Sequence, residues 1–214
     1  MSSASARHFP TTRLSQPGEP PWDVALLYPL QGSWTERDYL ELGTNRLVEF
    51  SDGCIEVLPM PTKLHQRIVR FLFLVLQEFV SARGLGEVFF APLPVRLWPG
   101  KFREPDILFV RPGRAEYGGQ PEGADLVMEV VSEGEENRRR DFETKPQEYA
   151  RAGIPECWII DPANQRVTVL VLEDSTYRQH GDFAPGDTAT SAILSGLAVP
   201  VTDLFASDPP GRYG

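Results

Sequence analysis

Two short apolar runs near the middle of the chain each carry one carboxylate. Asp106 immediately precedes the run 107–110, and Glu129 lies inside the run 126–131. Runs of this length, rich in β-branched residues, predict strands of a buried sheet. A carboxylate within such a strand is costly to bury unless it is paired or holds a cation. Two such residues on consecutive strands therefore suggest a shared metal ion.

The hydrophobic pattern elsewhere predicts further helices and strands. The expected helices are a short one at 36–41, a long one that Pro61-Thr62 caps and Arg83-Gly84 ends, and one at about 142–152. The expected strands are a hairpin at 47–50 and 54–57, an irregular stretch at 87–98, and strands at 157–161 and 166–173. Residues 194–205 are expected to pack back on the core. This order predicts an α/β fold with a mixed central sheet flanked by helices.

The composition is that of an ordinary globular chain. Its 214 residues are 41% hydrophobic and 24% charged. We expect a flexible arm at 1–30, which is rich in Ser, Pro and Thr, then a single domain at 31–207 and a flexible tail at 208–214. No apolar run is long enough for a membrane span, and the N-terminus lacks the apolar region of a signal peptide. A cytoplasmic protein without membrane contact is therefore expected, with Cys54 and Cys157 as reduced thiols.

The net charge of −9 at first argues against a nucleic-acid partner. The charge is unevenly distributed, however. Residues 60–160 hold 14 Lys and Arg against 15 Asp and Glu, a net charge of −1, and the flanks hold 7 against 15, a net charge of −8. If some acidic residues of the middle segment bind a metal, the remainder is basic on balance, and DNA remains a candidate partner.

The residues alone leave two interpretations of the carboxylate pair open. Asp106 could bond loop amides while Glu129 forms a buried ion pair. Alternatively, both could hold Mg²⁺ or Mn²⁺, with the Val130 carbonyl as a third oxygen, because these cations prefer oxygen ligands. Lys145 is either a solvated helix lysine or a cation that steadies the attacking water and the charge on a phosphate. In the second case its removal should leave folding intact.

Basic residues near the carboxylates are candidates for DNA contact. Arg138, Arg139 and Arg140 form either a solvated segment paired with three nearby glutamates or an arm that contacts phosphates. The glutamates in question are Glu133, Glu135 and Glu136. Lys101 and Arg103 are further tentative DNA-binding residues.

Short motifs follow one another along the chain in a specific order. They are Glu49 with Asp52-Gly53, Met60-Pro61, His65-Gln66, Glu104-Pro105-Asp106, Glu129-Val130-Val131-Ser132, Asp141 with Lys145, Tyr149 with Ala152-Gly153, and the segment 156–162. The series resembles the Uma-type restriction endonuclease family, a bacterial branch of the PD-(D/E)xK nuclease superfamily. The resemblance covers roughly residues 35–205, and the ordered series is more specific than any single motif.

The resemblance implies a restriction-endonuclease-like core with Asp106 and Glu129 as the acidic pair. Val131 stands where the superfamily lysine would be, and Lys145 from the following helix matches its substitute. Glu49 matches an acidic residue that could be an extra metal ligand, and His65 matches a recurrent histidine without an assigned role.

The expected function is Mg²⁺- or Mn²⁺-dependent hydrolysis of DNA phosphodiester bonds by a homodimer, because cutting both strands calls for two symmetric sites. The alternative is a catalytically weak or inactive nuclease-fold module that binds nucleic acid or protein.

Overall fold

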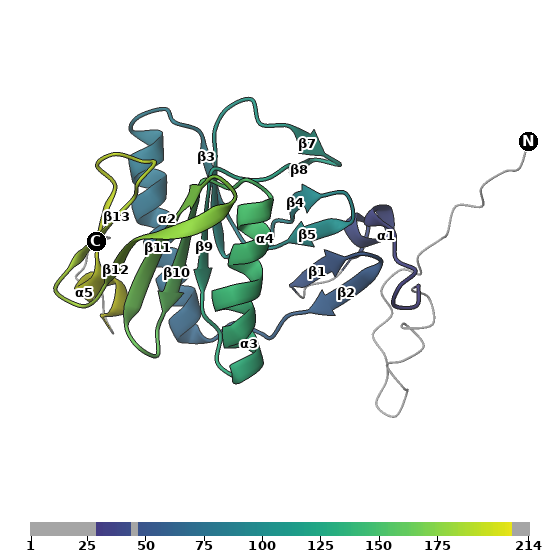
Figure 1. Cartoon of the computed structure of the whole chain (residues 1–214), viewed down its shortest axis with the longest axis horizontal. Helices are drawn as coiled ribbons and strands as arrows, with labels where there is room; N and C mark the ends of the chain where they lie inside the picture. The colour runs from purple at the N-terminus through teal and green to yellow at the C-terminus, as the bar shows by residue number, and fades with distance from the viewer. Residues whose placement is uncertain (1–28, 44–46, 207–214) are drawn as a thin grey trace, which may run out of the picture.

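The structure is a computed structural model, and it describes residues 29–43 and 47–206. The tail predicted at 208–214 and nearly all of the arm predicted at 1–30 lie outside the described residues. The described part contains a large sheet, a small sheet beside it, and helices on both faces of the large sheet (Figure 1).

The large sheet has six strands in the order β12-β11-β10-β9-β6-β3. Their bounds, in that order, are Thr176–Phe183, Arg166–Glu173, Glu156–Asp161, Leu126–Val130, Ile107–Val110 and Glu87–Phe90. β9 and β10 are parallel, and the other neighbouring pairs are antiparallel. The predicted mixed sheet is therefore confirmed, and β6 and β9 are neighbours in it.

The small sheet has four strands in the order β2-β1-β5-β4. Their bounds, in that order, are Cys54–Val57, Val48–Ser51, Lys101–Arg103 and Val95–Trp98. β1 and β2 form the predicted hairpin, in which Asp52 and Gly53 both have positive φ, as a tight turn requires. Two further pairs of short strands are β7 with β8 and β13 with β14, at Glu116–Tyr117, Gln120–Pro121, Thr188–Thr190 and Ala198–Pro200.

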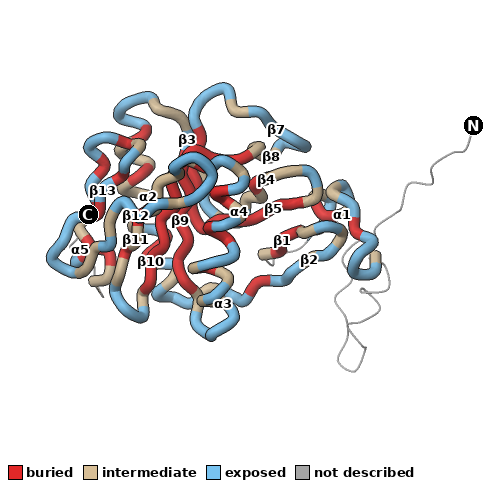
Figure 2. Tube along the Cα trace, viewed as in Figure 1, coloured by how far each residue is buried: buried red, intermediate tan, exposed pale blue. Residues whose placement is uncertain are grey.

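Two hydrophobic cores cover the two faces of the large sheet. Helix α2 (Lys63–Ser81), capped by Thr62 as predicted, packs on one face through Ile68, Leu72 and Leu76. Residues from 194 onwards, including helix α5 (Val201–Phe205), join this core, which confirms that the chain packs back here. Helix α4 (Lys145–Arg151) covers the opposite face. Figure 2 shows the central strands buried throughout their length.

The small sheet has its own core, to which helix α1 (Glu36–Leu40) contributes Tyr39. The helix has the predicted N-terminus, since Thr35 and Asp38 form a reciprocal capping box. No helix among residues 29–43 and 47–206 is both long and apolar enough to cross a membrane.

The helix predicted at 142–152 begins earlier than expected. Helix α3 (Glu135–Arg139), a π-helical turn (Arg140–Thr144) and α4 follow one another without a break, as the continuous green helix of Figure 1 shows. The amide of Lys145 donates to the carbonyl of Arg140, five residues back. The wider turn directly precedes Pro146, which has no amide hydrogen and would crowd a regular α-helix. The polar residues 135–140 thus form the first turns of the helix that carries Lys145.

The stretch predicted as one irregular strand at 87–98 is divided between the sheets. β3 is an edge strand of the large sheet and β4 an edge strand of the small one. The segment with Pro92 and Pro94 connects them, because proline cannot donate to a strand ladder.

Candidate active site

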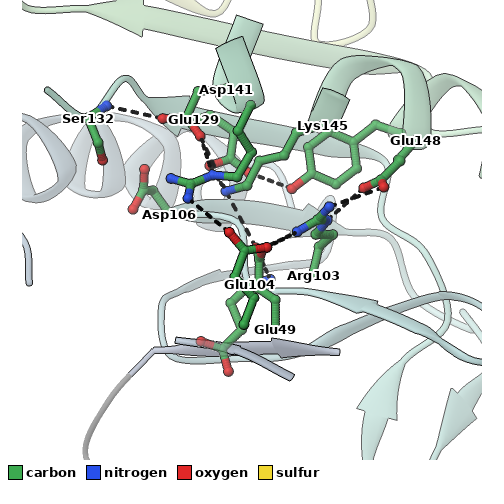
Figure 3. Close-up of polar contacts among 12 residues, drawn as sticks. Glu49, Arg103, Glu104, Asp106, Glu129, Ser132, Asp141, Lys145 and Glu148 are labelled. Atoms are coloured by element: carbon green, nitrogen blue, oxygen red, sulfur yellow. Dashed lines mark hydrogen bonds and ion pairs between the residues drawn. The ribbon is translucent and has the colours of Figure 1, made fainter. Parts of the chain in front are cut away.

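Asp106 and Glu129 come together because β6 and β9 are antiparallel neighbours. The register pairs Ile107 with Met128, so the preceding Asp106 lies opposite Glu129. One carboxylate oxygen of Asp106, Oδ2, accepts the amide hydrogen of Val130 at 2.7 Å. Both carboxylates line one small pocket, to which Lys145 also contributes. Figure 3 shows this group of side chains.

Glu129 is held by two side chains of α4. Its Oε2 accepts a hydrogen bond from Lys145 Nζ at 2.7 Å, and its Oε1 accepts one from the Tyr149 hydroxyl. All three residues are at most 3% exposed. Burial raises the pKa of Glu129, and repulsion from Asp106 and Asp141 raises it further against the attraction of Lys145. The carboxylate is thus fixed in place within a strongly negative site.

Lys145 lies among several carboxylates and is buried. Besides Glu129, its Nζ lies 3.5 Å from Glu49 Oε1 and 3.9 Å from Asp141 Oδ1. Burial alone would lower the pKa of Lys145, but attraction to Glu129, Glu49 and Asp141 raises it overall. The ammonium is therefore charged at neutral pH, and the interpretation as a solvated helix lysine is wrong.

A chain of ion pairs ties the small sheet to α4 behind this centre. Arg103 contacts Glu49 with one end of its guanidinium and Glu148 with the other, where Nε lies 2.6 Å from Oε2. Lys101 Nζ lies 2.6 Å from Glu148 Oε1. Burial raises the pKa of Glu49, but Lys145 and Arg103 outweigh it and lower the pKa overall. Glu49 is thus a charged anchor for two cations.

The expectation that Lys101 and Arg103 bind DNA disagrees with their burial. They are 5% and 4% exposed, and their charges are satisfied by carboxylates. A phosphate could reach them only if these pairs were broken, so their place in the structure is that of supports for α4 and Glu49.

Asp106 is oriented by a histidine of α2. His65 Nε2 lies 3.2 Å from Asp106 Oδ1. Burial would lower the pKa of His65, but the hydrogen bond and the charge of Asp106 raise it overall. The other ring nitrogen, Nδ1, is buried and has no partner among the described residues. His65 therefore fixes the carboxylate at the edge of the pocket.

Glu104 adds another carboxylate to the pocket. It accepts hydrogen bonds from the Val48 amide at 3.2 Å and the Tyr39 hydroxyl at 3.4 Å. Burial and the repulsion of Glu49 raise the pKa of Glu104 to about 7. The motif 104–106 thus supplies two acidic side chains, of which only Asp106 was predicted from sequence to act in the site.

The three consecutive arginines have different environments. Arg138 forms a bidentate pair with Asp161 at 3.0 and 2.7 Å, and Arg140 contacts Asp141 at 3.1 Å. Arg139 is exposed. The alternative that Arg138 and Arg140 pair with the nearby glutamates is wrong. Arg138 pairs with Asp161 of β10, and Arg140 pairs with Asp141 and with Glu56 of β2. Arg138 and Arg140 nevertheless line the two pockets at this end of the sheet.

The charges of the pocket suit a divalent cation. It is lined by four carboxylates and two permanent cations, namely Glu104, Asp106, Glu129, Asp141, Arg140 and Lys145. The available volume is about 30 Å³, enough for an ion or a water molecule. Within the described ranges, no three His, Cys, Asp or Glu side chains converge as a ready-made metal site. Mg²⁺, however, is commonly held by one or two carboxylates together with water and substrate phosphate, so Asp106, Glu129 and the Val130 carbonyl fit it.

Comparison with protein families matches residues 35–202 to the Uma2 family, described as "Putative restriction endonuclease". The chain belongs to this family. The resemblance inferred from the ordered motifs is thereby confirmed. No curated protein matches the chain.

A crystal structure from Anabaena variabilis, described as "a putative nuclease belonging to DUF820", is similar to this Uma2 family member at 23% identity with a TM-score of 0.64. The similarity covers 80% of this chain and 97% of that one. At this identity the similarity shows the fold alone. Together with the mixed sheet, it confirms the predicted restriction-endonuclease-like α/β fold.

Several residues that build the site were given no role in the sequence analysis. Tyr149 and Asp141 appeared only as parts of motifs, although they lie four residues on either side of Lys145. On a helix this spacing places all three on one face, so it was a usable signal. Arg103 was considered for DNA contact only, because nothing local in the sequence pairs it with Glu49 and Glu148.

Proposed function

We propose that this chain is an endonuclease that hydrolyses DNA phosphodiester bonds with Mg²⁺ or Mn²⁺. The observation that carries the proposal is the convergence of Asp106, Glu129 and Lys145 on one pocket with an excess of two carboxylates over permanent cations. Oxygen ligands gathered in so small a pocket favour a divalent cation. Membership of a family described as restriction endonucleases supports the same chemistry.

In this proposal Asp106, Glu129 and the Val130 carbonyl hold the cation. When bound, the cation supplies Lewis-acid stabilisation of charge on the scissile phosphate. His65 and the Val130 amide orient Asp106, while Tyr149 orients Glu129. These partners hold the carboxylates in position before a ligand arrives.

Lys145 acts as a fixed positive charge. Because its pKa is raised, the ammonium stays protonated at neutral pH and cannot take a proton from the attacking water. It can donate a hydrogen bond to that water or to a phosphate oxygen as negative charge develops. Glu49 pairs with Lys145, so we assign Glu49 to holding this lysine in place and not to binding the metal.

A binding module without cleavage is the second candidate, and one observation favours it. All four oxygens of Asp106 and Glu129 already have protein partners: His65, the Val130 amide, Lys145 and Tyr149. A cation would have to share or replace some of these bonds. If it cannot, the fold would bind nucleic acid or protein without hydrolysis.

Calorimetric titration with Mn²⁺ tests the metal site. We expect the full chain to bind one ion and Asp106→Ala to lose that binding, because one of two side-chain ligands is removed. Glu143→Ala, which removes an exposed carboxylate from the adjacent π-helical turn, is the matched control and should bind as the wild type does. Equal binding by Asp106→Ala and wild type would contradict the assignment.

For the whole assembly we propose a homodimer on DNA, since one site per chain cuts one strand. The exposed Arg139 is the member of the arginine run most available for phosphate contact. Light scattering of the purified chain tests the dimer, and a strict monomer would favour nicking of single strands.

A further inference from the structure

A second pocket adjoins the candidate active site. Its volume is about 220 Å³, and it lies between the start of α2, the α3 segment and the turn after β10. Its walls include Met60, Leu64, Asn137, Arg138, Pro162 and Ala163. The function proposed above gives this pocket no role.

The two pockets share part of their walls. Pro59, Pro61, His65 and Ser132 line both of them. His65 also holds Asp106, at 3.2 Å. A ligand in the larger pocket would therefore lie directly beside a phosphate bound at Asp106 in the smaller one.

The lining combines apolar walls with fixed polar groups. Met60 and Leu64 are 66% and 44% exposed, unusually high for large apolar side chains, and Met60 stands between two prolines. Exposed apolar surface next to a polar cleft is typical of a ligand site. At the other side, Asn137 is fixed by a 2.7 Å bond to the Glu133 carbonyl, and Arg138 by Asp161. The pocket thus suits a flat ring system with an apolar face and a polar edge.

We infer that this pocket receives one unpaired nucleobase of the substrate strand, next to the scissile phosphate. The inference rests on the proposed function, because it takes the phosphate to lie at Asp106 and Glu129. The volume is below the roughly 300–1,000 Å³ of pockets for larger ligands, which matches a single base. A base of the strand being cut is the ring system that lies closest to that phosphate.

The inference narrows the substrate class. A base in a continuous duplex is stacked and paired, so it must leave the helix to enter a pocket, and this costs least for an unpaired base. The preferred substrate is therefore single-stranded DNA, or a duplex with an unpaired nucleotide at the cleavage position.

Binding of oligonucleotides labelled with 2-aminopurine tests the inference without requiring cleavage. The full chain is titrated in Ca²⁺ with the label in a single strand, in a complete duplex, and as an unpaired base in an otherwise complete duplex. We expect the first and third to bind roughly tenfold more tightly than the second, with a change in fluorescence as the base enters the pocket.

Ala163→Trp is designed to fill the pocket. Ala163 is exposed and lines only the larger of the two pockets, so a tryptophan there should leave the fold and the carboxylates intact. Ala115→Trp, at another exposed alanine, is the matched control. Met60→Ala removes one apolar wall and keeps the test valid if the first variant folds poorly.

Ala163→Trp should abolish the preference for unpaired bases, Met60→Ala should weaken it, and Ala115→Trp should retain it. Equal binding of the three oligonucleotides by wild type, or an unchanged preference in Ala163→Trp, overturns the inference. If the preference follows the pocket but no cleavage occurs, the nuclease proposal fails and the base pocket stands. If wild type cleaves DNA but the pocket variants keep the wild-type preference for unpaired bases, the nuclease proposal stands and the base pocket fails.

Discussion

At the scale of single residues, the site is determined by how each buried charge is compensated. Glu129 and Lys145 are almost completely buried, yet they pair with each other, and each has further polar contacts: Glu129 with the Tyr149 hydroxyl and Lys145 with Glu49. Removing one member of such a pair leaves an uncompensated charge in a medium of low polarity. Variants at these positions will therefore report on stability as well as on catalysis.

Lys145→Ala illustrates this coupling. From sequence, the loss of a catalytic lysine should leave folding intact, but Lys145 is the shared partner of Glu129 and Glu49. We expect the free energy of unfolding to fall by about 3–5 kcal/mol, measured by urea denaturation. Lys63→Ala, at an exposed helix position, should change it by no more than about 0.5 kcal/mol. Equal stability of the two variants would show that the buried pairs contribute little.

Tyr149→Phe tests whether the orientation of Glu129 matters. The change removes only the hydroxyl that donates to Glu129. We expect Mn²⁺ affinity to fall by about tenfold or more in calorimetry, as is usual when a partner of a metal ligand is lost. Tyr177→Phe removes a hydroxyl that donates to the Ile154 carbonyl at 2.8 Å, away from the pocket, and should leave affinity unchanged. The same affinity in Tyr149→Phe as in wild type would assign the tyrosine to packing alone.

At the scale of elements, the continuous helix from Glu135 to Arg151 positions Lys145 and Tyr149 against Glu129. Its hydrophobic periodicity was visible from Phe142 onwards, but the first two turns are polar and carry no core residue. Exposed turns of this kind leave no hydrophobic pattern, so the sequence could not place the helix start. The π-helical turn likewise depends on the packed context, although Pro146 marked an irregularity.

Arg103→Leu tests how the small sheet is joined to α4. It leaves Glu49 and Glu148 each with one fewer buried partner, so we expect a loss of about 3–5 kcal/mol in the free energy of unfolding. Arg166→Leu breaks an exposed pair with Asp182 and should cost at most about 1 kcal/mol. Denaturant titration of both variants gives the comparison, and similar losses would contradict a structural role for the buried pair.

At the scale of the whole molecule, local patterns predicted most elements but not their division into two sheets. The hairpin, β6 and β9 follow from short apolar runs and turn signals, and α2 from its helical periodicity and its cap. All four occur where expected. The assignment of β3 and β4 to different sheets depends on contacts between segments far apart in sequence. For the same reason the motifs supplied Asp106, Glu129 and Lys145, whereas Arg103 and Arg138 acquired their partners only through the fold.

The most direct test of the account is cleavage of supercoiled plasmid by the full chain in Mg²⁺, Mn²⁺ or EDTA. We expect nicked or linear product with either metal and none in EDTA. Glu129→Gln should cleave more slowly by roughly a hundredfold or more, and the exposed control Glu143→Gln at the wild-type rate. No product from wild type in either metal, or undiminished cleavage by Glu129→Gln, would contradict a metal-dependent nuclease centred on this carboxylate.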